Sequence, residues 1–281
     1  MLLLVDLDGV VYRGSDPVAG IAALLTARAA AGDNVAYITN NSMHYRADYV
    51  TRLASLGAPV SADRVITSPR ATAMYLVERE PGIRRVLTVG ASGLDRELRD
   101  VGLEVVGSSY AAERMAKEGL DGWTAAGHPD AVVAGLDPQL TYLRIAAAVD
   151  CIRAGARFIA TNRDPVYPTE RGLRPGAGSV IAAIESASGV VPLVIGKPEP
   201  LLLREAARAV GVDPRHAVVI GDGLHTDIAA AIAVGARSVL ILTGVSTRAQ
   251  AEALPPDRRP TAIATDATEL ASVLERLSAD G

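Results

Sequence analysis

Four short polar motifs each follow a run of apolar residues, and together they offer the groups that bind a metal ion and a phosphate. They are Asp6-Leu7-Asp8-Gly9, Thr39-Asn40-Asn41-Ser42, Gly196-Lys197-Pro198, and Gly221-Asp222-Gly223 with Asp227 close behind. Two aspartates directly after a buried strand cannot both lie uncompensated in a core, because burying an unpaired carboxylate is costly. We therefore expect a cation or a reaction at Asp6 and Asp8.

These aspartates, together with Asp222 and Asp227, supply enough hard oxygen ligands for Mg²⁺. The hydroxyl of Thr39 and the ammonium of Lys197 then provide donors that can face a phosphate. Lysine is rare in this chain, since Lys117 and Lys197 are its two lysines. The presence of one of them in a polar motif supports a role for it in the chemistry.

Short apolar runs alternate with segments of helical periodicity, a pattern that is typical of βαβ units and a parallel sheet. The predicted strands are residues 2–7, 35–39, 86–89, 131–134, 157–160, 193–195, 217–220 and 238–242. The predicted helices are residues 21–31, 47–56, 139–154, 201–210 and 228–234. Ligands of open parallel sheets bind outside the carboxyl ends of the strands, so we expect the four motifs to converge on one crevice.

The length of 281 residues favours two domains over one. Residues 80–178 have a strand and helix pattern of their own, without polar motifs at the strand ends. We predict that they form a domain inserted into a core of residues 1–79 and 179–281. Gly82 and Pro175-Gly176-Ala177-Gly178 lie near the two ends of this insertion, where glycine and proline suit a hinge.

The net charge of −4 and the isoelectric point of about 5.6 create no positive field that would attract nucleic acid or an anionic membrane. The first apolar run is interrupted by Asp6 and Asp8, which makes it too short for a signal sequence or a membrane span. We therefore expect a cytoplasmic protein. The single cysteine, Cys151, lies in a helical pattern and is expected to be a buried thiol.

Several residues have plainer interpretations. Asp227 could cap the helix that follows it. Gly221-Asp222-Gly223 begins like a dinucleotide-binding fingerprint, but Thr226 stands where a third glycine is expected. We expect His225 to be exposed to solvent or at the rim of the site, and Trp123 to be a packing residue.

The four motifs, in this order, resemble those of the haloacid dehalogenase-like phosphatase superfamily. The long insertion between the second and third motifs is similar to the branch that contains pyridoxal phosphatase, phosphoglycolate phosphatase, nitrophenyl phosphatase and the nucleotidase NagD. The resemblance implies an α/β fold with a Rossmann-like parallel sheet core, in which residues 80–178 form an α/β cap over the active site. The resemblance leaves open whether the protein forms a homodimer through the cap.

By the same resemblance, the protein is expected to be a magnesium-dependent phosphatase that acts on small phosphorylated metabolites through an aspartyl-phosphate. Asp6 would be the nucleophile, and Asp8 would act first as general acid and then as general base. Asp6, Asp222 and the backbone carbonyl of Asp8 would hold Mg²⁺. Asp227 would support the metal or orient Lys197.

The resemblance also assigns residues to the two parts of the substrate. The phosphate oxygens would be bound by Thr39, Asn40, Asn41 and Lys197. The leaving group would be selected by three cap residues, Tyr167, Arg163 and Tyr142. A tyrosine packed on its own turn is a nearly equal interpretation of Tyr167.

Other functions are weighed against this one. A dehalogenase lacks the carboxylate found at Asp8, and the type of cap argues against a phosphomutase. Another phosphotransferase of the superfamily stays open as an alternative. A catalytically idle binding protein of the same fold would have no need of intact Asp6, Lys197 and Asp222. The four motifs recognise only the phosphate, so the physiological substrate has to come from a hydrolysis screen.

Overall fold

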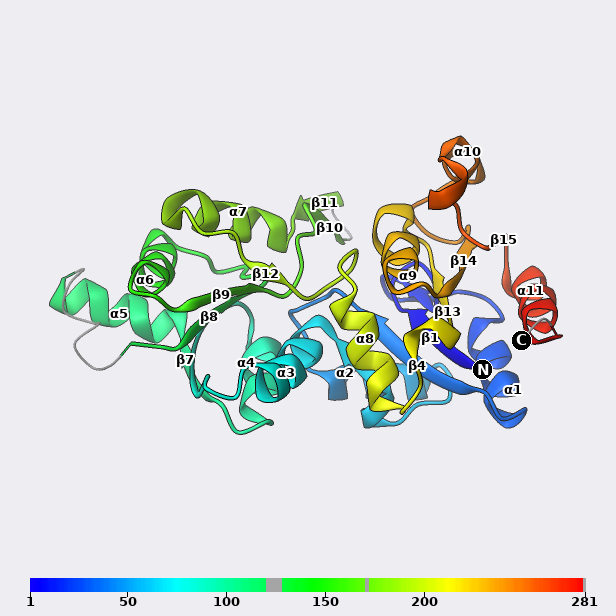
Figure 1. The fold of residues 1–281 in the computed structure, drawn as a ribbon, viewed down its shortest axis with the longest axis horizontal. Coiled ribbons are helices and arrows are strands. Elements are labelled where there is room, and N and C mark those ends of the chain that lie inside the picture. The colour runs from blue at the N-terminus through cyan, green and yellow to red at the C-terminus, as the bar shows by residue number, and fades with distance from the viewer. Residues whose placement is uncertain (120–127, 170–171, 280–281) are drawn as a thin grey trace. The chain divides into compact units, whose positions relative to one another are not determined.

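The computed structural model describes residues 1–119, 128–169 and 172–279, which form two compact units (Figure 1). Unit 1 consists of Met1–Thr39, Ala47–Thr67 and Lys197–Gly281, and unit 2 consists of Asn40–Arg46 and Ser68–Gly196. The boundaries predicted at residues 80 and 178 lie inside unit 2. Trp123 lies outside the described residues.

Unit 1 is built on a six-stranded parallel sheet in the order β15-β14-β13-β1-β4-β5. Its strands are β1 (Leu2–Asp6), β4 (Asn34–Thr39), β5 (Val65–Thr67), β13 (Ala217–Gly221), β14 (Arg237–Ile241) and β15 (Ala262–Ala264). Their apolar residues are almost completely buried, as expected for a parallel sheet that is covered on both faces. A small antiparallel hairpin, β2 (Tyr12–Arg13) and β3 (Asp16–Pro17), follows β1.

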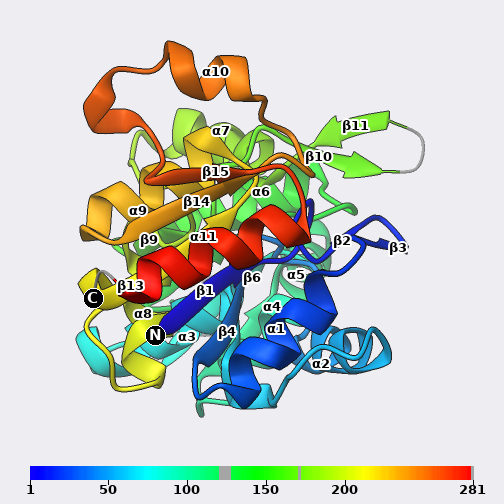
Figure 2. The same cartoon turned by 90° about the vertical axis from the view of Figure 1, so that its right-hand side faces the viewer.

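Helices cover both faces of this sheet. They are α1 (Ile21–Ala30), α2 (Arg46–Ser55), α8 (Leu201–Ala209), α9 (Ala229–Val234), α10 (Arg248–Ala253) and α11 (Ala267–Ala279). Figure 2 shows α1 and α11 on the face of the sheet opposite to α8. The residues Leu224–Ile228, directly before α9, form a π-helical turn.

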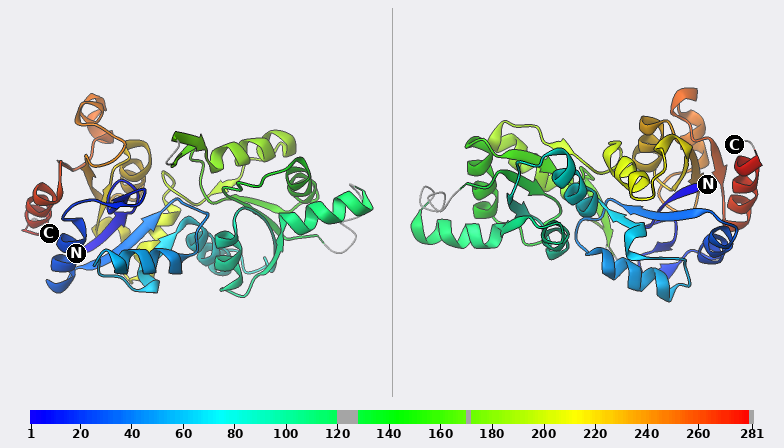
Figure 3. Two further views of the ribbon diagram at one scale, coloured as in Figure 1. Left: turned by 180° about the vertical axis from the view of Figure 1, so that it is seen from behind. Right: turned by 60° about the horizontal axis from the view of Figure 1, so that its bottom comes forward.

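Unit 2 contains a five-stranded parallel sheet in the order β12-β9-β8-β6-β7. Its strands are β6 (Arg85–Val89), β7 (Glu104–Gly107), β8 (Ala131–Ala134), β9 (Arg157–Ala160) and β12 (Leu193–Val194). An antiparallel hairpin is formed by β10 (Val166–Thr169) and β11 (Gly172–Pro175). The helices of this unit are α3 (Ser68–Arg79), α4 (Ser92–Arg99), α5 (Ser108–Glu118), α6 (Tyr142–Arg153) and α7 (Ala177–Ser188) (Figure 3).

The structure confirms the predicted fold class, because both units are α/β with parallel sheets. All eight predicted strands and all five predicted helices are present, with ends that shift by a few residues. The elements not predicted include strands β2, β3, β5, β7, β10, β11 and β15 and helices α3, α4, α5, α7, α10 and α11. Among the described residues, no helix has both the length and the apolar character needed to span a membrane.

Candidate active site

The sheet order of unit 1 brings three of the predicted motifs side by side. Strand β1 lies between β13 and β4, and all three run in the same direction. Asp6 ends β1, Thr39 ends β4, and Asp222 follows the last residue of β13. The carboxyl ends of parallel strands lie at one edge of the sheet, so these residues share that edge.

Lys197 joins two of the acidic residues. Its Nζ donates to Asp6 Oδ1 at 2.6 Å and to Asp227 Oδ1 at 2.6 Å. The Lys197 side chain is 3% exposed and that of Asp227 is 1% exposed, so this bridge is almost completely shielded from water. Charge-assisted hydrogen bonds of this kind are stronger than neutral ones and fix the ammonium in place.

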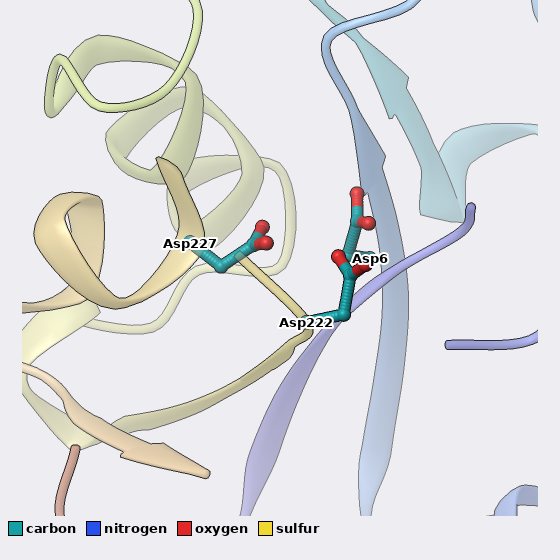
Figure 4. A group of neighbouring side chains, drawn as sticks. All are labelled: Asp6, Asp222 and Asp227. Carbon is teal, nitrogen blue, oxygen red and sulfur yellow. The ribbon is translucent and has the colours of Figure 1, made fainter. Parts of the chain in front are cut away.

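Asp6, Asp222 and Asp227 also form a compact group of carboxylates. One oxygen of each lies within 4.8 Å of the others, and all three side chains are buried. Figure 4 shows the Asp222 carboxylate beside that of Asp6, with Asp227 directed toward both from the other side. Three carboxylates against one ammonium leave negative charge unbalanced, and buried charge of this kind calls for a cation. Hard carboxylate oxygens are the ligands that Mg²⁺ prefers, so the donor set fits this ion.

The pKa shifts of these carboxylates and of Lys197 reflect the same excess of buried negative charge. Burial raises the pKa of Asp6, Lys197 opposes this change, and the charges of Asp227 and Asp222 add to it. The pKa of Asp222 rises to about 6, first through burial and then through the charge of Asp227. Burial alone would lower the pKa of Lys197, but Asp227 and Asp6 raise it above its ordinary value, so this side chain stays an ammonium.

Two glycines let the backbone approach Asp222 closely. A Cβ on Gly9, which has a φ of +81°, would lie 2.2 Å from Asp222 Oδ2, and one on Gly244 would lie 1.8 Å from the same atom. Both positions therefore exclude any side chain. The N–H of Val245 donates to Asp222 Oδ2 at 2.8 Å and holds the carboxylate in this orientation.

Asp227 does not cap a helix, as one interpretation of the sequence suggested. It lies inside the π-helical turn, and the residue at the N-cap position of α9 is Ile228. Its Oδ2 accepts from the N–H of Gly223 at 3.1 Å and from the hydroxyl of Thr226 at 3.3 Å. Because its other oxygen bonds to Lys197, Asp227 is well placed to orient that ammonium.

The remaining residues of the first two motifs are divided between the two units. Asp8 is half-buried and forms an isolated bridge with Tyr12, while Thr39 is buried at the end of β4. Asn40 follows Thr39 but belongs to unit 2, where its side chain donates to both carboxylate oxygens of Asp164 at 3.1 Å. The Oδ1 of Asn41 accepts from a backbone N–H two residues further on.

The three residues predicted to select the leaving group have different surroundings within unit 2. Tyr167 is half-buried and lines a cavity of about 620 Å³, together with its cross-strand neighbour Arg174. Arg163 pairs with Glu185 of α7 at 2.5 Å and does not line this cavity. Tyr142 is 78% exposed at the start of α6. The structure therefore brings Tyr167, and neither of the other two, to the cavity.

The expectation that the middle of the chain has no polar residues at strand ends was wrong. Asn162 and Asp164 lie two and four residues after the end of β9, and both are hydrogen-bonded to Asn40. Asn162 is 3% exposed, and its Nδ2 donates to the backbone oxygen of Asn40 at 2.7 Å. The rule applied to the other motifs, polar residues just after an apolar strand, would have pointed to this segment.

Comparisons with known proteins agree with this geometry. A family model described as haloacid dehalogenase-like hydrolase matches residues 3–104, and a second model of haloacid dehalogenase-like hydrolases matches residues 194–270. The D-glycerol 3-phosphate phosphatase of Mycobacterium tuberculosis is 39% identical over 95% of this chain and 70% of its own length. The acid sugar phosphatase of Staphylococcus aureus is 36% identical over 87% of both chains.

Solved structures show the same relationship. The p-nitrophenyl phosphatase of Archaeoglobus fulgidus has a TM-score of 0.83 and 29% identity, covering 97% of this chain and 98% of its own. The glycerol phosphate phosphatase of Mycobacterium tuberculosis in complex with magnesium has a TM-score of 0.80 and 37% identity, covering 96% of this chain and 75% of its own. The chain therefore belongs to the haloacid dehalogenase-like hydrolases, in the branch that contains the glycerol phosphate, acid sugar and nitrophenyl phosphatases.

Proposed function

We propose that the protein hydrolyses phosphate monoesters of small metabolites through a phosphate ester on Asp6, with Mg²⁺ as cofactor. The observation that carries this proposal is the buried bridge from Lys197 to Asp6 and Asp227, with Asp222 beside it. Asp6 is buried, is paired with the ammonium of Lys197, and lies among carboxylates whose negative charge exceeds that of one ammonium. This environment suits a carboxylate nucleophile that works next to a metal ion.

The first half of the reaction forms the covalent intermediate. An Asp6 oxygen attacks phosphorus, the bond from phosphorus to the ester oxygen breaks, and Asp8 gives its proton to that leaving oxygen. Lys197, the Thr39 hydroxyl and the backbone N–H of Asn40 bind the other phosphate oxygens. These donors act where negative charge is concentrated in the transition state.

The second half releases phosphate. Asp8, now a carboxylate, takes a proton from water as the water oxygen attacks phosphorus, and the bond from phosphorus to Asp6 breaks. Asp6, Asp222 and the backbone carbonyl of Asp8 would hold Mg²⁺, and bound Mg²⁺ supplies positive charge that lets an anionic nucleophile meet an anionic substrate. Asp227 keeps Lys197 in position through its hydrogen bond.

The proposal is tested with nitrophenyl phosphate and glycerol phosphate, with and without Mg²⁺. We expect turnover that requires the metal and disappears in Asp6→Asn, because an amide is neither a nucleophile nor a good ligand. Asp8→Asn should lower kcat by ~10²–10⁴-fold through the loss of proton transfer. Full turnover by Asp6→Asn or by EDTA-treated protein would refute the mechanism, and no turnover by the wild type would favour the idle binding protein.

We further propose that Tyr167 influences which leaving group is accepted. An aromatic face can pack on a ring or exclude water from a short chain, so Tyr167→Ala should change kcat/KM unequally for nitrophenyl phosphate and glycerol phosphate. Tyr110, which is exposed on α5 and does not line the cavity, provides a matched Tyr110→Ala control with unchanged values. A uniform loss in Tyr167→Ala would assign this residue to folding instead.

The proposal includes two further points. We propose that the enzyme is cytoplasmic, and that it forms a homodimer through unit 2, an arrangement that the resemblance leaves open. Light scattering during size-exclusion chromatography measures the mass directly. A monomer at micromolar concentration would contradict the dimer.

A further inference from the structure

The backbone carbonyl of Asn40 is held by two buried side chains from distant parts of unit 2. The hydroxyl of Ser68, at the start of α3, donates to Asn40 O at 2.8 Å. The Nδ2 of Asn162, two residues after β9, donates to the same oxygen at 2.7 Å. Ser68 is 0% exposed and Asn162 is 3% exposed, so water does not compete for this oxygen.

Two donors to one carbonyl have a geometric consequence. A carbonyl oxygen has two lone pairs, and these two hydrogen bonds occupy both of them. The peptide unit between Asn40 and Asn41 is planar, so fixing its oxygen also fixes the N–H of Asn41 on the opposite side. The carbonyl cannot turn toward an anion, which it would repel.

The side chain of Asn40 is fixed as well. Its Nδ2 donates to both oxygens of Asp164 at 3.1 Å, and the N–H of Asp164 donates to Asn162 Oδ1 at 3.1 Å. A Cβ on Gly196 would lie 2.6 Å from Asn40 Oδ1 and 2.9 Å from the Cβ of Asn162, so the chain directly before Lys197 packs tightly against this group. Asn40 is therefore held at its carbonyl and at its side chain.

We infer that Ser68 and Asn162 are positioning residues for phosphate binding: they fix the Asn40 carbonyl so that the backbone N–H of Asn41, in the same peptide unit, keeps the orientation that an anion needs. This inference rests on the proposed function, in which the backbone at Asn40 binds the phosphate. Neither residue touches the reacting atoms, and both act through the Asn40 peptide. Preorganised donors of this kind strengthen anion binding because nothing has to reorganise when the anion arrives.

The test compares Ser68→Ala, Asn162→Ala and the double variant with the wild type. Dissociation constants for inorganic phosphate and orthovanadate are measured by calorimetry in the presence of Mg²⁺, and kcat and KM are measured for nitrophenyl phosphate and glycerol phosphate. Each single variant keeps one donor on the carbonyl and should weaken anion binding about fivefold. The double variant frees the carbonyl and should weaken it about a hundredfold, more than the product of the two single effects.

Because both substrates carry the same phosphate, kcat/KM should fall by the same factor for each. Thr88→Val is the matched control, since it removes another buried hydroxyl hydrogen bond of unit 2, from Thr88 to Asp95 at 2.6 Å. We expect it to lower the melting temperature and to leave the anion constants at wild-type values. Equal weakening in Thr88→Val and in the single variants would mean that any loosening of unit 2 has this effect, and would overturn the inference.

The outcomes separate this inference from the proposed function. A wild type that hydrolyses monoesters, combined with variants whose anion constants are unchanged, would overturn the inference alone. A wild type that binds orthovanadate without turnover, with weaker binding in the variants, would overturn the proposed mechanism and support the inference. If the double variant does not fold, the fivefold effect of each single variant still decides the question.

Discussion

Lys197 is an ammonium held between two carboxylates in a site that is nearly closed to water. In the proposed reaction it stabilises charge on the phosphate, and it also compensates Asp6 and Asp227 in the resting protein. Its removal would therefore affect binding, catalysis and folding together. The second lysine of the chain, Lys117, is exposed on α5 and offers a natural comparison.

We expect Lys197→Ala to lower kcat/KM by about 10²–10³-fold, the cost of losing one preorganised donor to a developing charge. Lys117→Ala should match the wild type. Lys197→Arg should not restore the full rate, because a planar guanidinium cannot occupy the place of a compact ammonium. Kinetics with both substrates, together with a circular dichroism check of folding, decide the matter, and equal losses in the two alanine variants would contradict the assignment.

Among single residues, the sequence predicts those whose role follows from their side-chain chemistry and from their position after an apolar strand. Asp6, Lys197 and Asp222 follow apolar strands, and the structure places them together. Ser68 was not predicted, because its partner is a backbone oxygen rather than a side chain, and Asn162 was missed although it lies two residues after β9. Asn162 lies 122 residues from Asn40 in sequence, and no local pattern can reveal a hydrogen bond over that separation.

At the scale of the elements, helix α4 carries a charged residue that is completely buried. Glu97 on this helix is 0% exposed, forms an ion pair with Arg46, and accepts from the backbone N–H of Arg46 at 3.0 Å. A glutamate inside a helix would be placed on the solvent face by hydrophobic pattern alone. The ion pair with Arg46 offsets the free-energy cost of burying the Glu97 carboxylate.

Glu97→Ala should lower the free energy of unfolding by about 1–3 kcal/mol, because it leaves the backbone N–H of Arg46 without its acceptor, while the Arg46 guanidinium keeps its ion pair with Asp100. The control is Glu118→Ala, which breaks a partly exposed pair with Arg114 in the same unit and should cost at most about 1 kcal/mol. Denaturant titrations followed by circular dichroism give both values. Similar losses in the two variants would show that burial of the pair is unimportant.

The sequence predicts elements where an apolar run is long enough to show its period. Strand β1 is an example, since it contains four apolar residues before Asp6. Strand β5 has only three residues, and the three-residue β15 has an equally weak signal. The segment predicted as a hinge, residues 175–178, forms the end of β11 and the start of α7.

For the whole molecule, the single cysteine offers a probe of how unit 2 opens. Cys151 lies on α6 with 0% exposure, and burial raises the pKa of its thiol to about 12. Thiolate is the reactive form, so the folded protein should not react with Ellman's reagent at neutral pH, whereas the unfolded protein should react at once. The rate measured against denaturant concentration then reports the opening of unit 2. Rapid labelling without denaturant would contradict the burial of this thiol.

The division of the chain also sets an order of events during translation. Unit 2 is complete once Gly196 has been made, whereas unit 1 still lacks β13, the strand that separates β1 from β14. Domains fold as units while the ribosome is still working, so unit 2 can become compact first, while β1 waits with one edge unpaired. Asp6 is synthesised long before Lys197 and Asp222, so it gains them as neighbours only after those residues have emerged. A nascent chain stalled after Gly196 but before Asp222 would carry a folded unit 2, and its Asp6 would not yet be a working nucleophile.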